Sequence, residues 1–142
     1  MKKVLFVGAL LFSDVSAAAE QVLLLDQLPR FVGDQVNLVD MSYVLFKERP
    51  CLLPIVHAKD MLGGEVRYGD GVHKLCWGLT LRQEVIIVDD LGDSSPPAPI
   101  STYFSAILAN NGTARITKSL YNKKNYEPCP QLGPDRWCQK TY

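Results

Sequence analysis

Alternation of apolar and polar positions is clearest in the middle of the chain, between residues 64 and 93. Residues 65–68 alternate with a period of two, which is the period of a half-buried strand. The Gly-Asp-Gly sequence at 69–71 favours a tight hairpin turn, since glycine adopts positive φ at little cost. Residues 72–79 alternate again, and the β-branched run at 85–88 is typical of a strand covered on both faces. The stretch therefore predicts a three-stranded antiparallel meander.

The second strand of this meander has its larger apolar side chains on one face. Leu75, Trp77 and Leu79 share that face with His73, while Cys76 lies on the other. We therefore expect the first face to point into the core, with Trp77 as a core side chain beside a disulfide.

Three further segments are predicted from the same pattern. Residues 20–28 are apolar and fit a first strand better than a short helix. The charged and proline residues at 47–50 are expected to break an apolar segment. The prolines of 94–99 predict a stiff, extended connection that crosses from one sheet edge to another.

The main ambiguity lies between residues 101 and 120. This segment fits either a helix capped at Ser101 or two strands joined by Asn111 and Gly112. An Asn-Gly pair between alternating segments favours the hairpin. Together with the meander, this predicts a mainly β protein: a single small domain over 20–142, an antiparallel sheet or barrel tied by disulfides, with room for one short helix.

The first 19 residues have the pattern of a secretory signal peptide. Lys2 and Lys3 precede an apolar run over 4–12, and small residues follow as far as Ala19. The run is too short to span a bilayer, and cleavage after Ala17 or after Ala19 fits equally well. Because the double lysine indicates a bacterial signal, we expect a periplasmic or extracellular protein without a membrane span after cleavage.

An even number of cysteines indicates disulfides in an exported chain, and this chain has four. Of the three possible pairings we expect Cys51 with Cys76 and Cys129 with Cys138. The first would staple an N-terminal segment to the meander, and the second would close a small loop near the C terminus. Loop-closure entropy gives about 3.5 kcal/mol for the larger loop and about 2.7 kcal/mol for the smaller.

Composition narrows the classes of partner. The chain has 15 basic and 15 acidic residues; without residues 1–19 it keeps 13 basic and 14 acidic residues, a net charge of −1. A nearly neutral chain has no general attraction to nucleic acid or anionic membranes. We therefore expect no nucleic-acid partner.

Candidate chemical sites are sparse. By residue type alone, a zinc site can combine two cysteines with the two histidines: Cys51, Cys76, His57 and His73. Their spacing matches no usual zinc pattern, and oxidised cysteines cannot ligate zinc. Asp89, Asp90 and Asp93 lack the spacing of a calcium loop and are expected to form a solvated turn. The sequence also lacks a nucleophile elbow and a Cys-x-x-Cys pair, so it predicts no metal, no cofactor and no catalytic residue.

The basic and aromatic residues after Leu120 are the best candidate for a binding surface. Trp137, between Arg136 and Cys138, is the leading interface residue, because aromatic and arginine side chains dominate binding energies. The full expected surface joins three aromatic and three basic residues: Trp137, Arg136, Tyr126, Tyr121, Lys123 and Lys124. A merely solvated face is the alternative interpretation of the lysines.

Residues 51–104 carry a set of residues in a recognisable order: Cys51, Tyr68, Asp70-Gly71, Cys76-Trp77, the run 85–89, Gly92-Asp93, Pro99 and Phe104. In this order they resemble small uncharacterised exported proteins of proteobacteria and their phages. The resemblance covers less than half of the chain and implies no activity.

The leading expectation is an exported, non-enzymatic binding domain whose partner is another protein or an envelope component. One alternative is a structural or assembly component of an envelope machine or virion. Another is a small periplasmic hydrolase or an inhibitor of one. The enzyme would require a cleft with two convergent carboxylates or a His–Asp pair.

Overall fold

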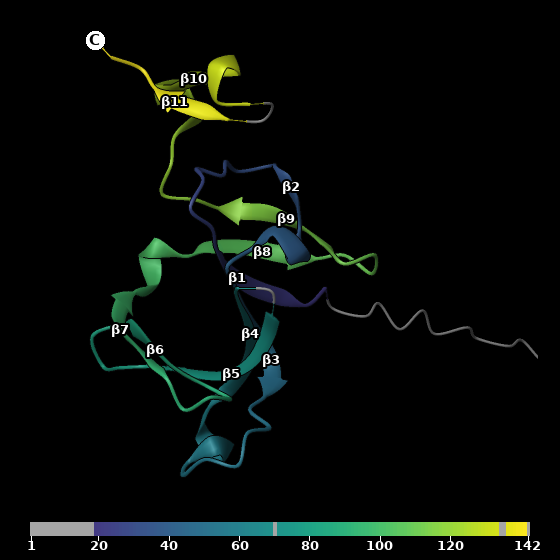
Figure 1. Cartoon of the computed structure of the whole chain (residues 1–142), viewed down its shortest axis with the longest axis vertical. Coiled ribbons are helices and arrows are strands. Elements are labelled where there is room, and N and C mark those ends of the chain that lie inside the picture. Colours follow the sequence, from purple (N-terminus) through teal and green to yellow (C-terminus); the bar gives the residue numbers. More distant parts are fainter. Residues whose placement is uncertain (1–18, 70, 134–135, 142) are drawn as a thin grey trace, which may run out of the picture.

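The computed structural model describes residues 19–69, 71–133 and 136–141, so nearly all of the predicted signal peptide, and Asp70 in the predicted turn, lie outside the described residues. Within them, nine strands form one antiparallel sheet and two more pair near the C terminus (Figure 1). The sheet order is β2-β9-β8-β1-β3-β4-β5-β6-β7. The strands are β1 (Gln21–Leu25), β2 (Gln35–Asn37), β3 (Tyr43–Pro50), β4 (Leu62–Tyr68), β5 (Gly71–Leu79), β6 (Glu84–Asp89), β7 (Ser94–Pro99), β8 (Phe104–Leu108), β9 (Thr113–Lys118), β10 (Tyr126–Pro128) and β11 (Trp137–Gln139). Single 3-10 turns join them: η1 (Leu38–Asp40), η2 (Ala58–Asp60), η3 (Ile100–Thr102), η4 (Lys123–Asn125) and η5 (Pro130–Leu132).

Strands β1 and β3 lie at the centre of the sheet and are buried on both faces. Val22 and Leu24 of β1 belong to one core cluster, whereas Leu23 between them belongs to another. The first cluster is completed by β2, β8 and β9, and the second by β4, β5 and β6. The two ends of the sheet therefore cover opposite faces of its centre. This explains the unbroken apolar run of β1, which is typical of strands covered on both sides.

The mainly β, antiparallel fold is confirmed, as an open sheet rather than a barrel, since β2 and β7 end the strand order. The predicted meander is β4, β5 and β6. The hairpin expected for residues 101–120 is β8 and β9, joined through Gly112 at φ +76°. A helix capped at Ser101 is wrong, because only the single turn η3 precedes β8.

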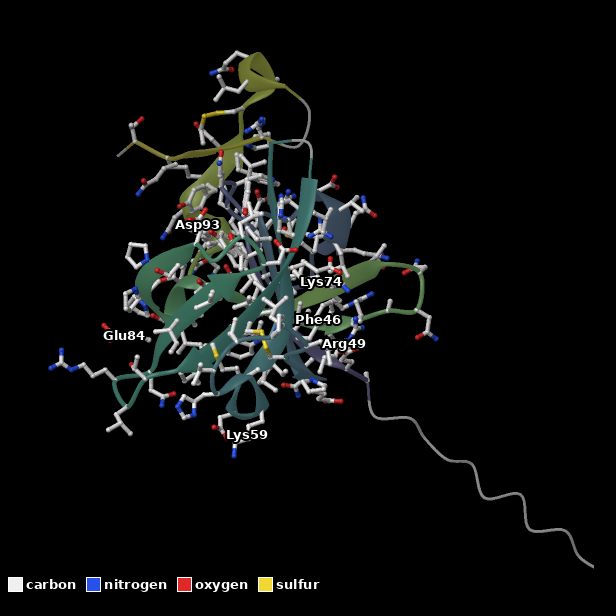
Figure 2. The ribbon with its side chains drawn as sticks, turned by 60° about the horizontal axis from the view of Figure 1, so that its bottom comes forward. Phe46, Arg49, Lys59, Lys74, Glu84 and Asp93 are labelled. Atoms are coloured by element: carbon white, nitrogen blue, oxygen red, sulfur yellow. A yellow bond between two sulfur atoms is a disulfide. The ribbon has the colours of Figure 1, made fainter. Side chains whose placement is uncertain are left out.

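Two expected breaks are in fact strands. Residues 47–50 continue β3, because Pro50 pairs with Leu62 of β4 after a register shift. Arg49 lies 3.6 Å above the Phe46 ring and pairs with Glu20 at 2.7 Å (Figure 2). The proline-rich segment does not cross between sheet edges but forms β7, the edge strand beside β6. An edge strand needs hydrogen bonds on one side only, so it tolerates prolines and also blocks further pairing.

Both predicted disulfides are present. Cys51 and Cys76 have Cα atoms 5.1 Å apart, and Cys129 and Cys138 have Cα atoms 5.5 Å apart. The first ties the loop of residues 51–61 to β5. Trp77 is buried in the second core cluster, as expected, and its indole Nε1 donates to the Phe46 carbonyl at 3.1 Å.

The predicted faces of β5 need one correction. Leu75 and Trp77 are buried, but Leu79 near the strand end is 44% exposed. Cys76 on the opposite face is fully buried, because the disulfide brings the 51–61 loop over it.

Candidate binding surface

The C-terminal segment folds back on itself into a small unit of η4, η5, β10 and β11, which we call the C-terminal unit. Its strands pair antiparallel, with Pro128 opposite Trp137, and the Cys129–Cys138 disulfide closes it. Since Tyr126 lies two residues from Pro128, Tyr126 and Trp137 project from the same face of the strand pair. The unit thus presents two aromatic rings on one side.

Those rings pack on Phe31, which is only 2% exposed. Phe31 makes edge-to-face contacts with Tyr126 at 5.4 Å and with Trp137 at 5.1 Å between ring centroids. Tyr121 lies edge-to-face on Tyr126 at 5.7 Å. We name Phe31, Tyr121, Tyr126 and Trp137 the aromatic cluster. It fixes the C-terminal unit against the sheet, because each such pair adds about 0.5–1.5 kcal/mol beyond its buried area.

One lysine joins this cluster. Lys123 is exposed on η4, and its Nζ lies 5.0 Å from the Trp137 ring centroid and 5.9 Å from that of Phe31. Lys124 and Arg136 are also exposed. The structure therefore gathers Tyr121, Tyr126, Trp137 and Lys123 from the predicted surface. Lys124 and Arg136 are exposed residues that follow Lys123 and precede Trp137 in the chain.

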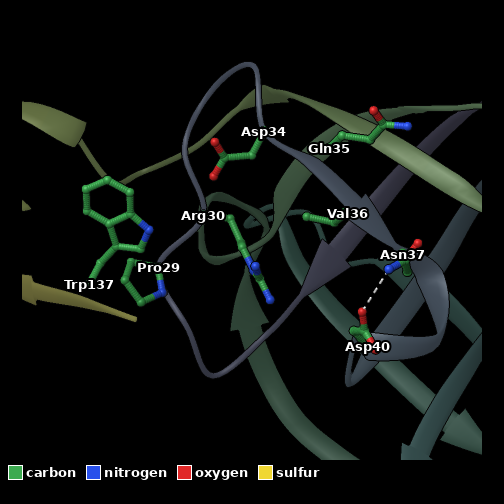
Figure 3. A pocket seen from close by; sticks show the side chains of 8 residues that line it. All are labelled: Pro29, Arg30, Asp34, Gln35, Val36, Asn37, Asp40 and Trp137. Atoms are coloured by element: carbon green, nitrogen blue, oxygen red, sulfur yellow. Dashed lines mark hydrogen bonds between the residues drawn. The ribbon is translucent and has the colours of Figure 1, made fainter. Parts of the chain in front are cut away.

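Two hollows flank the aromatic cluster. The first has a volume of about 380 Å³, and Trp137 borders it from one side (Figure 3). Its other lining residues come from the segment around β2: Pro29, Arg30, Asp34, Gln35, Val36, Asn37 and Asp40. The second hollow, of about 370 Å³, is lined by Phe31, Val32, Ser119, Leu120, Tyr121, Asn122 and Lys123. The sequence predicts no functional residue in the 29–40 segment, because nothing in its local pattern indicates that it meets Trp137.

Hydrogen bonds hold the polar wall of the first hollow in place. The Asp34 carboxylate accepts from the backbone N–H of Phe31 at 2.9 Å. The Asn37 amide donates to the Asp40 carboxylate at 3.2 Å. Arg30 pairs with Asp26 at 2.7 Å. These bonds hold Arg30, Asp34, Asn37 and Asp40 in the wall of the hollow.

A second polar group surrounds the turn after β6. Asp89 is 7% exposed, and its carboxylate accepts from the Tyr68 hydroxyl at 2.8 Å and from the backbone N–H groups of Leu91 and Asp93. Burial opposes ionisation of Asp89, but these hydrogen bonds outweigh it and hold its pKa below the usual value. Burial and the bond to Asp89 raise the pKa of Tyr68 to about 12. The expectation of a solvated turn is thus wrong for Asp89, because its carboxylate is buried and accepts hydrogen bonds from the backbone of the turn.

His73 belongs to the same group. Its ring stacks on Tyr68 at 4.5 Å, and its Nδ1 lies 3.0 Å from the Asp90 carboxylate. Asp90 also accepts from the backbone N–H of Lys74 at 3.1 Å. Since Asp89 and Asp90 are both occupied by such bonds, this group acts as a structural clasp between β5 and β6.

The zinc set considered above is ruled out, because Cys51 and Cys76 are joined to each other. Among the residues that the structure describes, no three His, Cys, Asp or Glu side chains are grouped to hold a metal ion. Within the same part of the chain, no helix is long and apolar enough to cross a membrane.

Comparison with protein-family models, curated proteins and solved structures gave no match. The resemblance to exported proteobacterial proteins therefore stays a prediction.

Proposed function

We propose that this protein is an exported binding domain whose recognition surface is centred on Trp137 and Lys123. The observation that carries the proposal is the aromatic cluster, gathered with a lysine between two hollows. Aromatic side chains backed by buried neighbours are the usual anchors of binding surfaces. The partner is another protein or an envelope component outside the cytoplasm.

Rigidity supports a binding role for this surface. The C-terminal unit is closed by the Cys129–Cys138 disulfide, and Phe31 holds Trp137 and Tyr126 from the sheet side. A surface that is already ordered loses less conformational entropy when its partner binds. Export is supported by the signal-like N terminus and by the two disulfides, which are typical of oxidising compartments.

A role in assembly is the second candidate function. It is favoured by exposed apolar side chains that lie far from the surface around Trp137. The loop of residues 51–61 lies at the end of the molecule away from the C-terminal unit (Figure 1, Figure 2). Leu52 and Val56 in this loop are 81% and 83% exposed. A protein that joins two neighbours in an assembly needs a second contact of this kind. The hydrolase alternative has less support, because the His–Asp pair that it requires, His73 with Asp90, is engaged in the clasp, where Asp90 also accepts from the backbone N–H of Lys74.

Site-specific photo-crosslinking in an exporting bacterial host tests the main proposal. A photoreactive residue replaces Lys124, the exposed neighbour of Lys123, and Leu81, which is fully exposed on the β5–β6 turn, serves as the matched control. We expect crosslinked products from position 124 and none from position 81. Products from position 81 or from Leu52, with none from position 124, would move the interface elsewhere and overturn the proposal.

A further inference from the structure

The first hollow has one aromatic wall, Trp137, and an otherwise mainly polar lining. We infer that it binds a neutral polyhydroxylated ligand, an oligosaccharide segment. This inference rests on the proposed function and specifies the chemistry of the partner.

The hydrogen-bonding groups of the hollow suit hydroxyls. Gln35 and Asn37 carry amides that both donate and accept, Arg30 only donates, and the carboxylates of Asp34 and Asp40 only accept. A sugar hydroxyl also donates and accepts, so a polyol can satisfy this mixed set. An apolar ligand would instead strip water from these groups without replacing its hydrogen bonds.

Charges around the hollow disfavour an anionic ligand. Arg30 is neutralised by Asp26 at 2.7 Å, and the carboxylates of Asp34 and Asp40 repel an anion.

The size and the position of the hollow suit a segment of a sugar chain. Its volume of about 380 Å³ falls in the range of roughly 300–1,000 Å³ that is usual for ligand sites. It runs beside β2, which ends the sheet order, so no further strand of the described sheet blocks it (Figure 3). Trp137 lines the hollow, and an aromatic ring attracts the weakly positive C–H groups of a sugar.

Fluorescence titration of the disulfide-bonded protein tests the inference. The probes are N-acetylchitohexaose, cellohexaose and maltohexaose, each added up to millimolar concentration. The protein has two tryptophans, and Trp77 is buried, so a saturable change reports on Trp137. We expect at least one oligosaccharide to give such a change. No change with any of the three would overturn the inference.

Two variants locate the site. Asn37→Ala removes an amide that bonds only to Asp40 within the described side-chain hydrogen bonds, and Asp40→Asn keeps the size of the carboxylate. Each is expected to weaken binding about tenfold, the effect of losing one good hydrogen bond. Glu127→Ala, at an exposed position of β10 that does not line the hollow, is the matched control and should bind normally. Unchanged binding by both hollow variants would place the sugar elsewhere and overturn the inference.

Cosedimentation with purified peptidoglycan sacculi distinguishes an envelope polymer from a free saccharide. Cosedimentation that is lost in Asn37→Ala supports the polymer, and binding of soluble oligosaccharides alone supports the free saccharide. If no saccharide binds but position 124 still crosslinks to a protein, the inference fails while the proposed function stands. If a saccharide binds, Asn37→Ala weakens that binding and position 124 yields no crosslinked product, the inferred sugar site is supported and a protein partner at this surface is rejected.

Discussion

The nine-stranded sheet and the C-terminal unit are stabilised in different ways. The sheet has two aliphatic clusters on opposite faces of β1 and β3, with Leu24 and Leu45 fully buried. The C-terminal unit has three-residue strands, a disulfide, and aromatic contacts to Phe31. The sheet therefore provides stability, and the unit provides a shaped surface whose order depends on the sheet and on one covalent bond.

The two disulfides differ in the same way, because one is attached to the buried sheet and the other lies in the C-terminal unit. Cys51–Cys76 attaches a loop to the fully buried inner part of β5, where Cys76 has no exposure. Cys129–Cys138 closes a unit whose described residues form no aliphatic cluster of their own. Removing the first should weaken the whole domain, whereas removing the second should loosen only the unit.

The largest effect is expected from the centre of the sheet. Leu24→Ala should lower the free energy of unfolding by about 2–5 kcal/mol, because it leaves a cavity among side chains that cannot collapse. Chemical denaturation followed by circular dichroism measures the loss. The matched control is Ile107→Ala on β8, which is 40% exposed, and it should cost less than about 1 kcal/mol. Equal losses in both variants would contradict the assignment of β1 to the core.

The next largest effect on stability is expected from variants that remove one disulfide by a double substitution. The Cys51→Ala, Cys76→Ala double variant should lose about 2–4 kcal/mol of global stability. The Cys129→Ala, Cys138→Ala double variant should leave the main unfolding transition within about 0.5 kcal/mol, since the unit opens independently of the sheet. Amide hydrogen exchange in β10 and β11 should rise sharply in the second variant only. A global loss of similar size in both would show that the two regions unfold as one.

Much of the fold of the sheet and of the C-terminal unit could be predicted from local sequence. The Asn111-Gly112 pair, the Gly-rich turn after Tyr68 and the cysteine count each act over a few residues, and the hairpin, the meander and both disulfides are confirmed. Burial of β1 on both faces depends on strands that follow much later in the chain. The sequence of β1 itself therefore shows an apolar run but does not show which strands cover it. The first hollow could not be predicted, because it brings the 29–40 segment beside Trp137 across about a hundred residues of chain.

The smallest effect concerns the clasp at Asp89. Its folded pKa lies below the unfolded value of about 3.9, so its stabilising contribution is complete above that pH and is lost as pH falls through the folded pKa. Tyr68→Phe removes one of the bonds that lower this pKa, so the acid-unfolding midpoint should move slightly to higher pH. An unchanged midpoint would show that the two backbone bonds suffice.

Tyr68 gives an independent readout at alkaline pH. Its pKa of about 12 lies above the unfolded value of about 10, so its contribution is complete below pH 10 and is lost as pH rises towards 12. The difference in tyrosinate absorbance between the native protein and Tyr68→Phe should show a step at about pH 12. A step near pH 10 would mean that the Tyr68–Asp89 bond does not persist in solution.

The division between a stabilising sheet and a proposed binding unit is tested most directly by one variant, Trp137→Ala, measured in two ways. The free energy of unfolding of the sheet should change by less than about 1 kcal/mol, because Trp137 lies outside both aliphatic clusters. Photo-crosslinking from position 124 should be lost in the same variant. Crosslinking at the native level, or a collapse of the sheet, would contradict the account.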